Sequence, residues 1–194
     1  SLVSDDTQFL YTDAIEFGLN NKQTVELVTL VKDAVFIYPQ QFTNPDGSTV
    51  IETLSFDVDG DGVSDETNIQ GRFLEDNELN FTNEKPYVIY GYAAVDEGKT
   101  LNIAAGARVH FHANSGLLVT NNASLHANGL LSTDDELLEN EIIFEGDRLE
   151  PGFSEVPGQW QTIWLFSGST DNKFDYTTIK NSTVGILVDG NQDD

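Results

Sequence analysis

The sequence contains no cysteine and no methionine, and only 9 of its 194 residues are Lys or Arg. Without cysteine the chain forms no disulfide, and it offers neither a thiolate nucleophile nor a cysteine-ligated zinc or iron–sulfur site. Nucleic-acid binding draws most of its affinity from Lys and Arg side chains that neutralise phosphates, so this composition excludes it. Attachment to an anionic membrane surface is excluded for the same reason. No apolar run approaches the roughly 18 residues that a membrane-spanning helix needs.

Acidic residues dominate the charge, since 33 Asp and Glu give the chain a formal net charge of -24. They are spread along the chain, 17 before Pro86 and 16 after it, so no acidic tail accounts for the charge. Apolar residues make up 39% of the sequence, which is enough to bury a core in a chain of this length. The composition therefore predicts a folded chain of one domain or two small ones.

Residues 1–86 have the pattern of a small antiparallel β-module. The segment 24–38 is rich in Val, Leu and Ile and is predicted to form a hairpin that turns at Lys32. A second hairpin is predicted over residues 71–81. A short helix at 13–19 is an alternative for the beginning of the chain, although a glycine within it argues that it would be short.

After Pro86 the sequence changes to many short apolar strands separated by Gly, Asn and Asp. This pattern favours a structural repeat. In it, a short strand, a polar bend and a second short strand together form part of one coil. Leu165 to Ile186 is predicted to be one such turn, and two excursions, roughly 127–140 and 146–159, are predicted to project as loops. Three segments share the pattern: VHFHANSGLLV from Val109, IIFEGD from Ile142 and TTIKNSTVGILV from Thr177.

Residues 87–129, YVIYGYAAVDEGKTLNIAAGARVHFHANSGLLVTNNASLHANG, carry a resemblance to a known family. They resemble the opening coils of right-handed parallel β-helix proteins on the surface of bacteria of the Bacteroidota type, mostly uncharacterised lipoproteins or surface proteins. The later stretch GQWQTIWLFSGSTDNKFDYTTIKNSTVGI continues the pattern, with Gln161 where a glycine is expected. The resemblance implies an all-β fold, a right-handed parallel β-helix over residues 87–194, and an extracellular or outer-surface location.

A solenoid of this kind places alternate apolar residues inward, where each coil covers its neighbour. We expect the coils to continue beyond the given chain, because a last coil without a cap leaves open strand edges. A lipid-modified cysteine upstream of Ser1 is a further expectation. The predicted inward positions are Leu101, Ile103, Val109, Phe111, Leu125 and Phe144.

The strongest motif for chemistry is DVDGDGVSD, residues 57–65, which matches the start of a D-x-D-x-D-G calcium loop. Alternate carboxylates in a tight loop converge on one centre, and hard Ca²⁺ takes six to eight oxygen ligands. No amphipathic helix flanks the motif, so it resembles the strand-borne loops of bacterial surface proteins and thrombospondin type 3 repeats more than an EF-hand. The alternative is a solvated acidic turn that binds no ion. The predicted ligands are Asp57, Asp59, Asp61, the carbonyl of Val63, Asp65, and Asn68 in place of the usual bidentate Glu.

Aromatic residues suggest a glycan-binding surface. Tyr90 and Tyr92 are predicted to share a strand face, and Trp160 and Trp164 lie beside the second excursion. Flat rings beside Asn and Asp would form a platform for sugars. The favoured alternative is that Trp164 or Phe166 fills the core while Trp160 covers a junction between coils.

Two further groups could hold a cation. His110 and His112 are two apart on a strand and point to one face, where His126 on a neighbouring coil could complete a transition-metal site. The alternative is three ordinary outward-facing histidines. The acidic run from Asp134 is a candidate for a second cation site, and a solvated excursion is the favoured alternative.

Together these patterns predict a calcium-stabilised, non-enzymatic bacterial surface or secreted protein. Its binding surface would be directed at glycans or at another surface protein. The alternative is the N-terminal part of a polysaccharide-degrading β-helix enzyme, a lyase or hydrolase, whose catalytic coils lie beyond Asp194. A lyase needs a basic residue to abstract a proton, and none of the five Lys and Arg after Pro86 clusters with the calcium motif.

Overall fold

A computed structural model describes residues 8–18 and 22–190 of the chain. In the described residues the protein is all-β, with nineteen strands and two short 3₁₀ helices. The chain divides into two compact units, residues 1–34 and 35–194.

The first unit is an antiparallel hairpin of β1 (Gln8–Phe17) and β2 (Gln23–Lys32), in register from Gln8 opposite Lys32 to Phe17 opposite Gln23. The predicted turn at Lys32 is therefore wrong, because the chain turns before β2 and not after it. The helix suggested for residues 13–19 is also wrong, because residues 13–17 belong to strand β1. Leu19 lies outside the described residues. Gly18 follows β1 with φ +104°, a conformation that favours glycine at the point where the strand ends.

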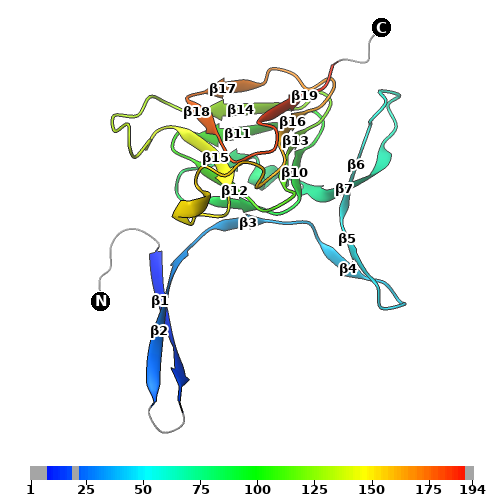
Figure 1. The fold of residues 1–194 in the computed structure, drawn as a ribbon. Helices are drawn as coiled ribbons and strands as arrows, with labels where there is room; N and C mark the ends of the chain where they lie inside the picture. The colour runs from blue at the N-terminus through cyan, green and yellow to red at the C-terminus, as the bar shows by residue number, and fades with distance from the viewer. Residues whose placement is uncertain (1–7, 19–21, 191–194) are drawn as a thin grey trace. The chain divides into compact units, whose positions relative to one another are not determined.

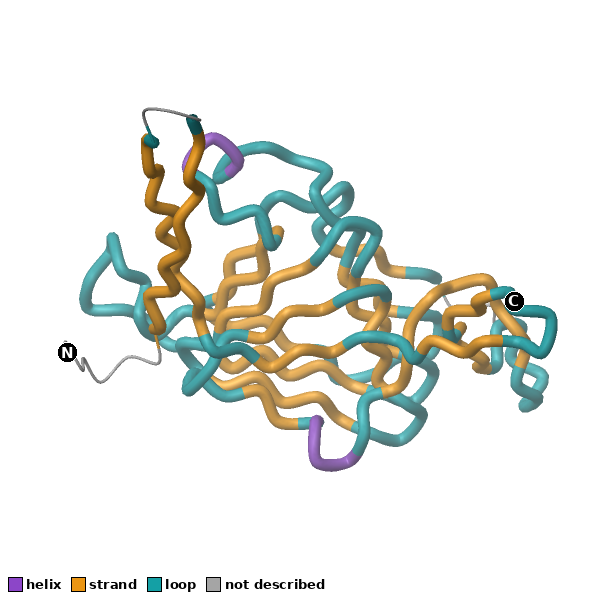
Figure 2. The backbone as a smooth tube through the Cα atoms, turned by 90° about the horizontal axis from the view of Figure 1, so that it is seen from below, coloured by secondary structure: helices purple, strands orange, loops and turns teal. Residues whose placement is uncertain are grey.

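Three sheets form most of the second unit, and from β7 onward each strand pairs in parallel with the strand three further along the chain (Figures 1 and 2). One sheet has the order β6 (Thr53–Phe56), β7 (Asp65–Phe73), β10 (Tyr92–Val95), β13 (Gly116–Val119), β16 (Ile163–Leu165) and β19 (Ile186–Val188), with only β6–β7 antiparallel. The second has the order β8 (Asn80–Phe81), β11 (Thr100–Ala104), β14 (Ser124–Asn128) and β17 (Lys173–Asp175). The third has the order β3 (Val35–Ile37), β9 (Tyr87–Ile89), β12 (Arg108–Phe111), β15 (Ile142–Gly146) and β18 (Thr177–Ile179).

The remaining elements are short. A separate hairpin pairs β4 (Gln41–Thr43) with β5 (Thr49–Ile51). The 3₁₀ helix η1 (Asp76–Glu78) connects β7 to β8, which belong to different sheets, so the hairpin predicted over 71–81 is wrong. The helix η2 (Pro151–Phe153) lies in the excursion after β15.

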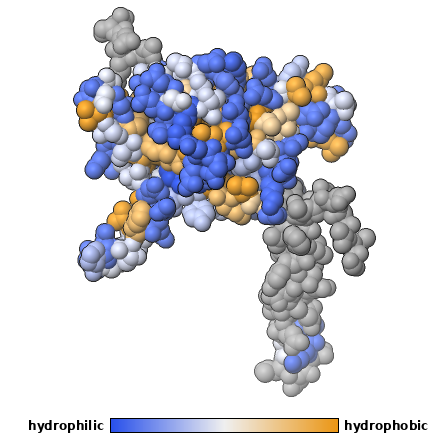
Figure 3. Space-filling model, turned by 180° about the vertical axis from the view of Figure 1, so that it is seen from behind, coloured by the Kyte–Doolittle hydropathy of each residue, from blue (hydrophilic) through white to orange (hydrophobic). Residues whose placement is uncertain are grey.

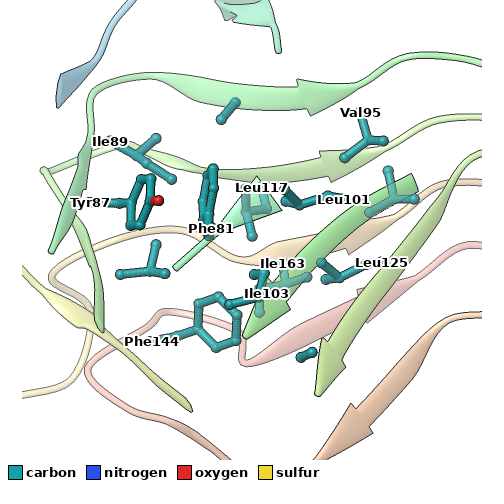
Figure 4. Packing of buried hydrophobic residues seen from close by; sticks show 14 of the residues in the cluster. Phe81, Tyr87, Ile89, Val95, Leu101, Ile103, Leu117, Leu125, Phe144 and Ile163 are labelled. Atoms are coloured by element: carbon teal, nitrogen blue, oxygen red, sulfur yellow. The ribbon is translucent and has the colours of Figure 1, made fainter. Parts of the chain in front are cut away.

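The central core is built by alternate residues of the parallel strands (Figure 4). All six predicted inward residues are fully buried, which confirms the in-out alternation over β11, β12, β14 and β15. Aromatic rings stack within this core, with Phe81 and Tyr87 at 3.9 Å and Phe111 and Trp160 at 4.1 Å between centroids. The prediction of an all-β chain with parallel strands is confirmed.

The repeat is visible in the strand register. Leu101 pairs with Leu125, 24 residues on, and the three segments that the sequence aligned contain β12, β15 and β18 of one sheet. Ile163 pairs with Ile186, so the last repeat is 23 residues and the predicted pairing of Leu165 with Ile186 is two residues out. Both excursions interrupt the repeat, one before β15 and one after it.

Strands from the first 86 residues belong to the parallel sheets. Val35 pairs with Tyr87, Gly71 with Tyr92, and Phe81 with Ile103, all in parallel. The boundary predicted after residue 86 thus falls inside the second unit, whereas the compact units divide after Ala34.

A second hydrophobic cluster, here called the outer cluster, lies on the opposite face of the sheet that contains β10 and β13. Ala93 and Val95 point into the central core, while Ala94 between them is buried in the outer cluster. The hairpin β6–β7 contributes two of its members and so covers this face. Because the centre of this sheet is buried on both faces, its strands β10 and β13 are continuous apolar runs. The buried members of the outer cluster are Leu54, Phe56, Ala94, Leu118 and Phe166.

Candidate metal centre

The loop between β6 and β7 brings three aspartates together. Carboxylate oxygens of Asp57, Asp59 and Asp61 all lie within 4.8 Å of one another. Phe56 precedes the loop and is anchored in the outer cluster, and Asp65 begins β7 opposite Phe56. The hairpin therefore fixes both ends of the loop, while the aspartates are at its tip.

Hydrogen bonds inside the loop set its shape. The Asp57 carboxylate accepts from the backbone N–H of Gly60 at 2.7 Å and of Gly62 at 2.8 Å. Gly60 and Gly62 have φ +80° and +83°, which explains why glycines stand at these two places. The Asp61 Oδ1 accepts from the N–H of Val63 at 2.7 Å. The backbone thus winds around the aspartates as a cation-binding loop requires.

The oxygen spacing suits a hard divalent ion. Calcium takes oxygen ligands at about 2.3–2.6 Å, so two ligands on opposite sides of one ion are separated by about 4.8 Å. The three carboxylates repel each other in the absence of a counter-charge, and a cation between them would remove that repulsion. The three carboxylates could therefore hold a hard divalent cation.

The other predicted ligands are placed differently. Asp65 lies outside the group of three, and its Oδ2 accepts from the N–H of Val58 at 3.0 Å. Asn68 lies inside strand β7, where its side chain is exposed. Val63 is 64% exposed, at the rim of the loop. The structure thus brings the carboxylates of Asp57, Asp59 and Asp61 to one centre, while the Val63 carbonyl and Asn68 remain predicted ligands.

The loop also borders a cavity of about 360 Å³ that the sequence did not reveal. Asp57, Gly60 and Gly62 line one side of it, and Asp96 and Glu97 from the turn after β10 line another. The packing of Phe56 against Phe166 and the rest of the outer cluster brings the loop beside this turn. Three acidic residues, Asp57, Asp96 and Glu97, therefore line the cavity, and only the folded position of the hairpin brings the last two beside the loop.

The predicted aromatic platform does not exist as one surface. Trp160 is fully buried, stacks on Phe111 and donates its indole N–H to the carbonyl of Lys180 at 2.8 Å. Its predicted role in ligand binding is wrong, because its ring has no exposed face. The alternative placed Trp160 over a junction between coils, whereas the structure buries it in the central core.

Tyr90 and Tyr92 also lie on different faces. Gly91, with φ +66°, forms the corner between β9 and β10, so the two tyrosines belong to different sheets. Tyr92 and Trp164 pack against the outer cluster, and burial raises the pKa of Tyr92. Trp164 donates its indole N–H to Asp189 at 2.6 Å. Of the four predicted residues, Tyr90 alone lies on the outward face of the sheet that contains β9.

The histidines each lie beside a carboxylate. His110 and His112 point away from the core while Val109 and Phe111 point into it, as predicted. His112 Nδ1 is 2.7 Å from Asp147, and His126, on another sheet, is 3.3 Å from Asp171. Across the described residues, the only group of three or more candidate metal ligands is the aspartate triad, so the histidine metal site is not supported.

The acidic excursion after Asp134 is held by its own hydrogen bonds. Glu139 accepts from the backbone N–H of Thr133 at 2.8 Å, from the Thr133 hydroxyl at 2.7 Å and from the N–H of Asp134. These donors, the Thr133 N–H first, lower the pKa of Glu139 to about 2. Arg108 donates to the carbonyls of Leu138 and Glu141, which fastens the excursion to β12.

Comparisons with family models, curated proteins and solved structures find no match to this chain. In the part of the chain that the structure describes, no helix has both the length and the apolar character needed to cross a membrane. Function must therefore be argued from the residues themselves.

Proposed function

We propose that the protein is a calcium-stabilised, non-enzymatic bacterial surface or secreted protein whose parallel β-helix displays a binding surface. The observation that carries the proposal is the triad of Asp57, Asp59 and Asp61, with carboxylate oxygens within 4.8 Å of one another.

The strand order supports a right-handed β-helix. Each round of the chain visits the three sheets in the same order, and the strands of successive rounds pair in parallel. Connections between parallel strands of one sheet are right-handed in nearly all proteins. Stacked coils of this kind form quasi-one-dimensional scaffolds whose outer faces are available for binding.

Calcium would act on the hairpin that covers the outer cluster. An ion held by the triad would fix the loop between Phe56 and Asp65, and thereby the hairpin that buries Leu54 and Phe56. Without a bidentate Glu, we expect affinity near the roughly 10⁻⁴ to 10⁻³ M of extracellular calcium modules. A site this weak is filled outside cells, where calcium is abundant.

The sequence resemblance and the charge support the location. Residues 87–189 resemble β-helix proteins of the bacterial surface, and the net charge of -24 keeps a β-rich chain from associating through its edges. Figure 3 shows hydrophilic residues over most of one face of the second unit.

Thermal unfolding with calcium and with excess chelator tests the proposal. A ligand at 100 times its dissociation constant stabilises the folded state by about 2.7 kcal/mol. For a domain of this size that corresponds to a rise in Tm of roughly 5–10 °C. The variant Asp59→Asn/Asp61→Asn should lose the rise, and Asp135→Asn/Glu155→Gln, which removes two exposed acids elsewhere, should keep it. An identical Tm for the native chain in calcium and in chelator would contradict the proposal.

A specific observation favours the alternative, a polysaccharide-degrading enzyme. Lys180 Nζ lies 2.7 Å from Glu145 Oε2, and His110 Nδ1 lies 3.5 Å from the other oxygen of Glu145, all on one outward face. A basic residue beside a carboxylate is what a lyase would use. Unsaturated products released from polygalacturonate by the native chain, and lost in Lys180→Ala, would favour the enzyme over the display protein.

A further inference from the structure

Four residues form a row across the outward face of the sheet that contains β3, β9, β12 and β15, and are here called the outward row. Each follows an inward position of the register: Ile37, Ile89, Phe111 and Gly146 are all buried. The parallel ladder continues through the row, since the N–H of Tyr90 donates to Ile37, that of His112 to Ile89 and that of Asp147 to Phe111. The outward row consists of Tyr38, Tyr90, His112 and Asp147.

One end of the row is aromatic and exposed. Tyr38 is 60% exposed, and Phe36, which points outward from the same edge strand, is 53% exposed. Next along the row, the Tyr90 ring lies 4.5 Å from the His112 ring, tilted by 31°. Aromatic side chains left in water on a regular strand face contribute little to folding, so their presence there points to a ligand.

The other end of the row is polar. His112 Nδ1 and Asp147 Oδ2 are 2.7 Å apart, which leaves the second Asp147 oxygen and the far edge of the His112 ring available. The His112 side chain is 49% exposed and that of Asp147 is 23% exposed. The row therefore offers flat apolar rings followed by an imidazole and a carboxylate held 2.7 Å apart.

This combination suits a sugar chain. The axial C–H face of a pyranose packs on an aromatic ring, while its hydroxyls need acceptors and donors such as a carboxylate and an imidazole. Adjacent parallel strands are about 4.8 Å apart, so the four positions span about 14 Å, the length of a short oligosaccharide. The chain has a charge of -24, which disfavours uronate-rich or sulfated glycans.

We infer that the outward row binds a neutral β-1,4-linked pyranose chain, which runs across the strands from Tyr38 to Asp147. A β-1,4-linked chain is flat and extended and so matches a flat sheet face, whereas an α-1,4-linked chain coils away from it. The inference deepens the proposed function, because it names the ligand class for the displayed surface. It depends on the display role and not on the calcium loop, which lies on a different sheet.

Calorimetric titration of the full chain with defined hexasaccharides tests the inference. Cellohexaose, xylohexaose or mannohexaose is expected to bind, while maltohexaose and hexagalacturonate are expected to bind at least tenfold more weakly. Tyr38→Ala should weaken binding by about tenfold through loss of one stacking contact. Asp147→Asn, which keeps the size of the side chain, should also weaken it. The control is Tyr176→Ala, because Tyr176 is 52% exposed at the corner between β17 and β18 and should not contribute.

The outcomes separate the two proposals. Failure of all three neutral β-linked hexasaccharides to bind, or equal affinities for Tyr38→Ala and Tyr176→Ala, overturns the inference. Tm values for each variant in calcium and in chelator show whether the chain is folded and whether calcium stabilises it. A calcium-dependent Tm without glycan binding overturns the inference alone, and glycan binding without a calcium effect overturns the calcium proposal alone.

Discussion

The central core and the outer cluster differ in how the chain assembles them. The central core is enclosed by three parallel sheets, and its residues come from every round of the chain. The outer cluster exists because a single hairpin, β6–β7, lies over the opposite face of one of these sheets. The repeating strand pattern of the sequence therefore specifies the central core. The outer cluster forms only if the β6–β7 hairpin packs on the sheet.

The aspartate loop belongs to the outer cluster's hairpin and not to the central core. The loop lies at the tip of the hairpin that covers the outer cluster, with Phe56 at its base. Local opening is easiest where an element has few partners. We expect the hairpin to be the part of the second unit that opens first, and calcium to act mainly there.

The largest predicted effect is the loss of stability when a core aromatic residue is removed, and it should differ between the two clusters. Phe111 is fully buried in the central core between Phe144 and Trp160, and Phe111→Ala should lower the free energy of unfolding by about 3–5 kcal/mol. Phe56 is 7% exposed and makes an edge contact with Phe166, so Phe56→Ala should cost less, about 2–3 kcal/mol. Urea unfolding followed by circular dichroism measures both. A cost for Phe56→Ala equal to or above that for Phe111→Ala would show that the clusters are one unit.

A smaller loss of stability is expected when Arg72, at the junction between the β6–β7 hairpin and the parallel sheet, is replaced. Arg72 lies where β7 joins the parallel sheet, and both of its terminal nitrogens are 2.6 Å from the Glu78 carboxylate. Its Nε donates to the Tyr38 carbonyl at 3.2 Å. Because lysine cannot make this paired contact, Arg72→Lys should lower the free energy of unfolding by about 1–3 kcal/mol. An unchanged urea midpoint would contradict this role.

The ion pair between Arg72 and Glu78 should make the stability of the protein depend on pH. The hydrogen bond with Arg72, above all, lowers the pKa of Glu78 below its ordinary value of 4.5. A lowered pKa contributes stability that is fully present above 4.5 and is lost as the pH falls through the value in the folded protein. The native chain should therefore lose its advantage over Glu78→Gln as the pH falls below about 4.5. Urea midpoints of both chains at pH 7 and pH 3 measure this, and a constant difference would contradict it.

The sequence predicted those features that depend on local pattern. The alternation around Leu101 and Val109 identified the core face, and the Asp-x-Asp-x-Asp spacing identified the loop. Features that depend on register were missed. Nothing local indicates that the turn at Asp96 lies beside that loop, or that the tryptophan after the second excursion, Trp160, enters the core.

The outward row was missed for a similar reason. Tyr38, His112 and Asp147 are far apart in the sequence, and only the parallel pairing of β3, β9, β12 and β15 aligns them. The hairpin at the beginning of the chain was missed because residues 24–38 were predicted to pair with one another across a turn at Lys32. They are in fact divided between an antiparallel strand in one unit and β3 in the other.

Amide hydrogen exchange with calcium and with chelator tests the central claim most directly. If calcium fixes the hairpin over the outer cluster, protection of amides in β6 and the first half of β7 should rise several-fold with calcium. Protection in β11 and β12 should change little, and Asp59→Asn/Asp61→Asn should abolish the response. Equal protection of β6 and β7 in calcium and in chelator would contradict the account.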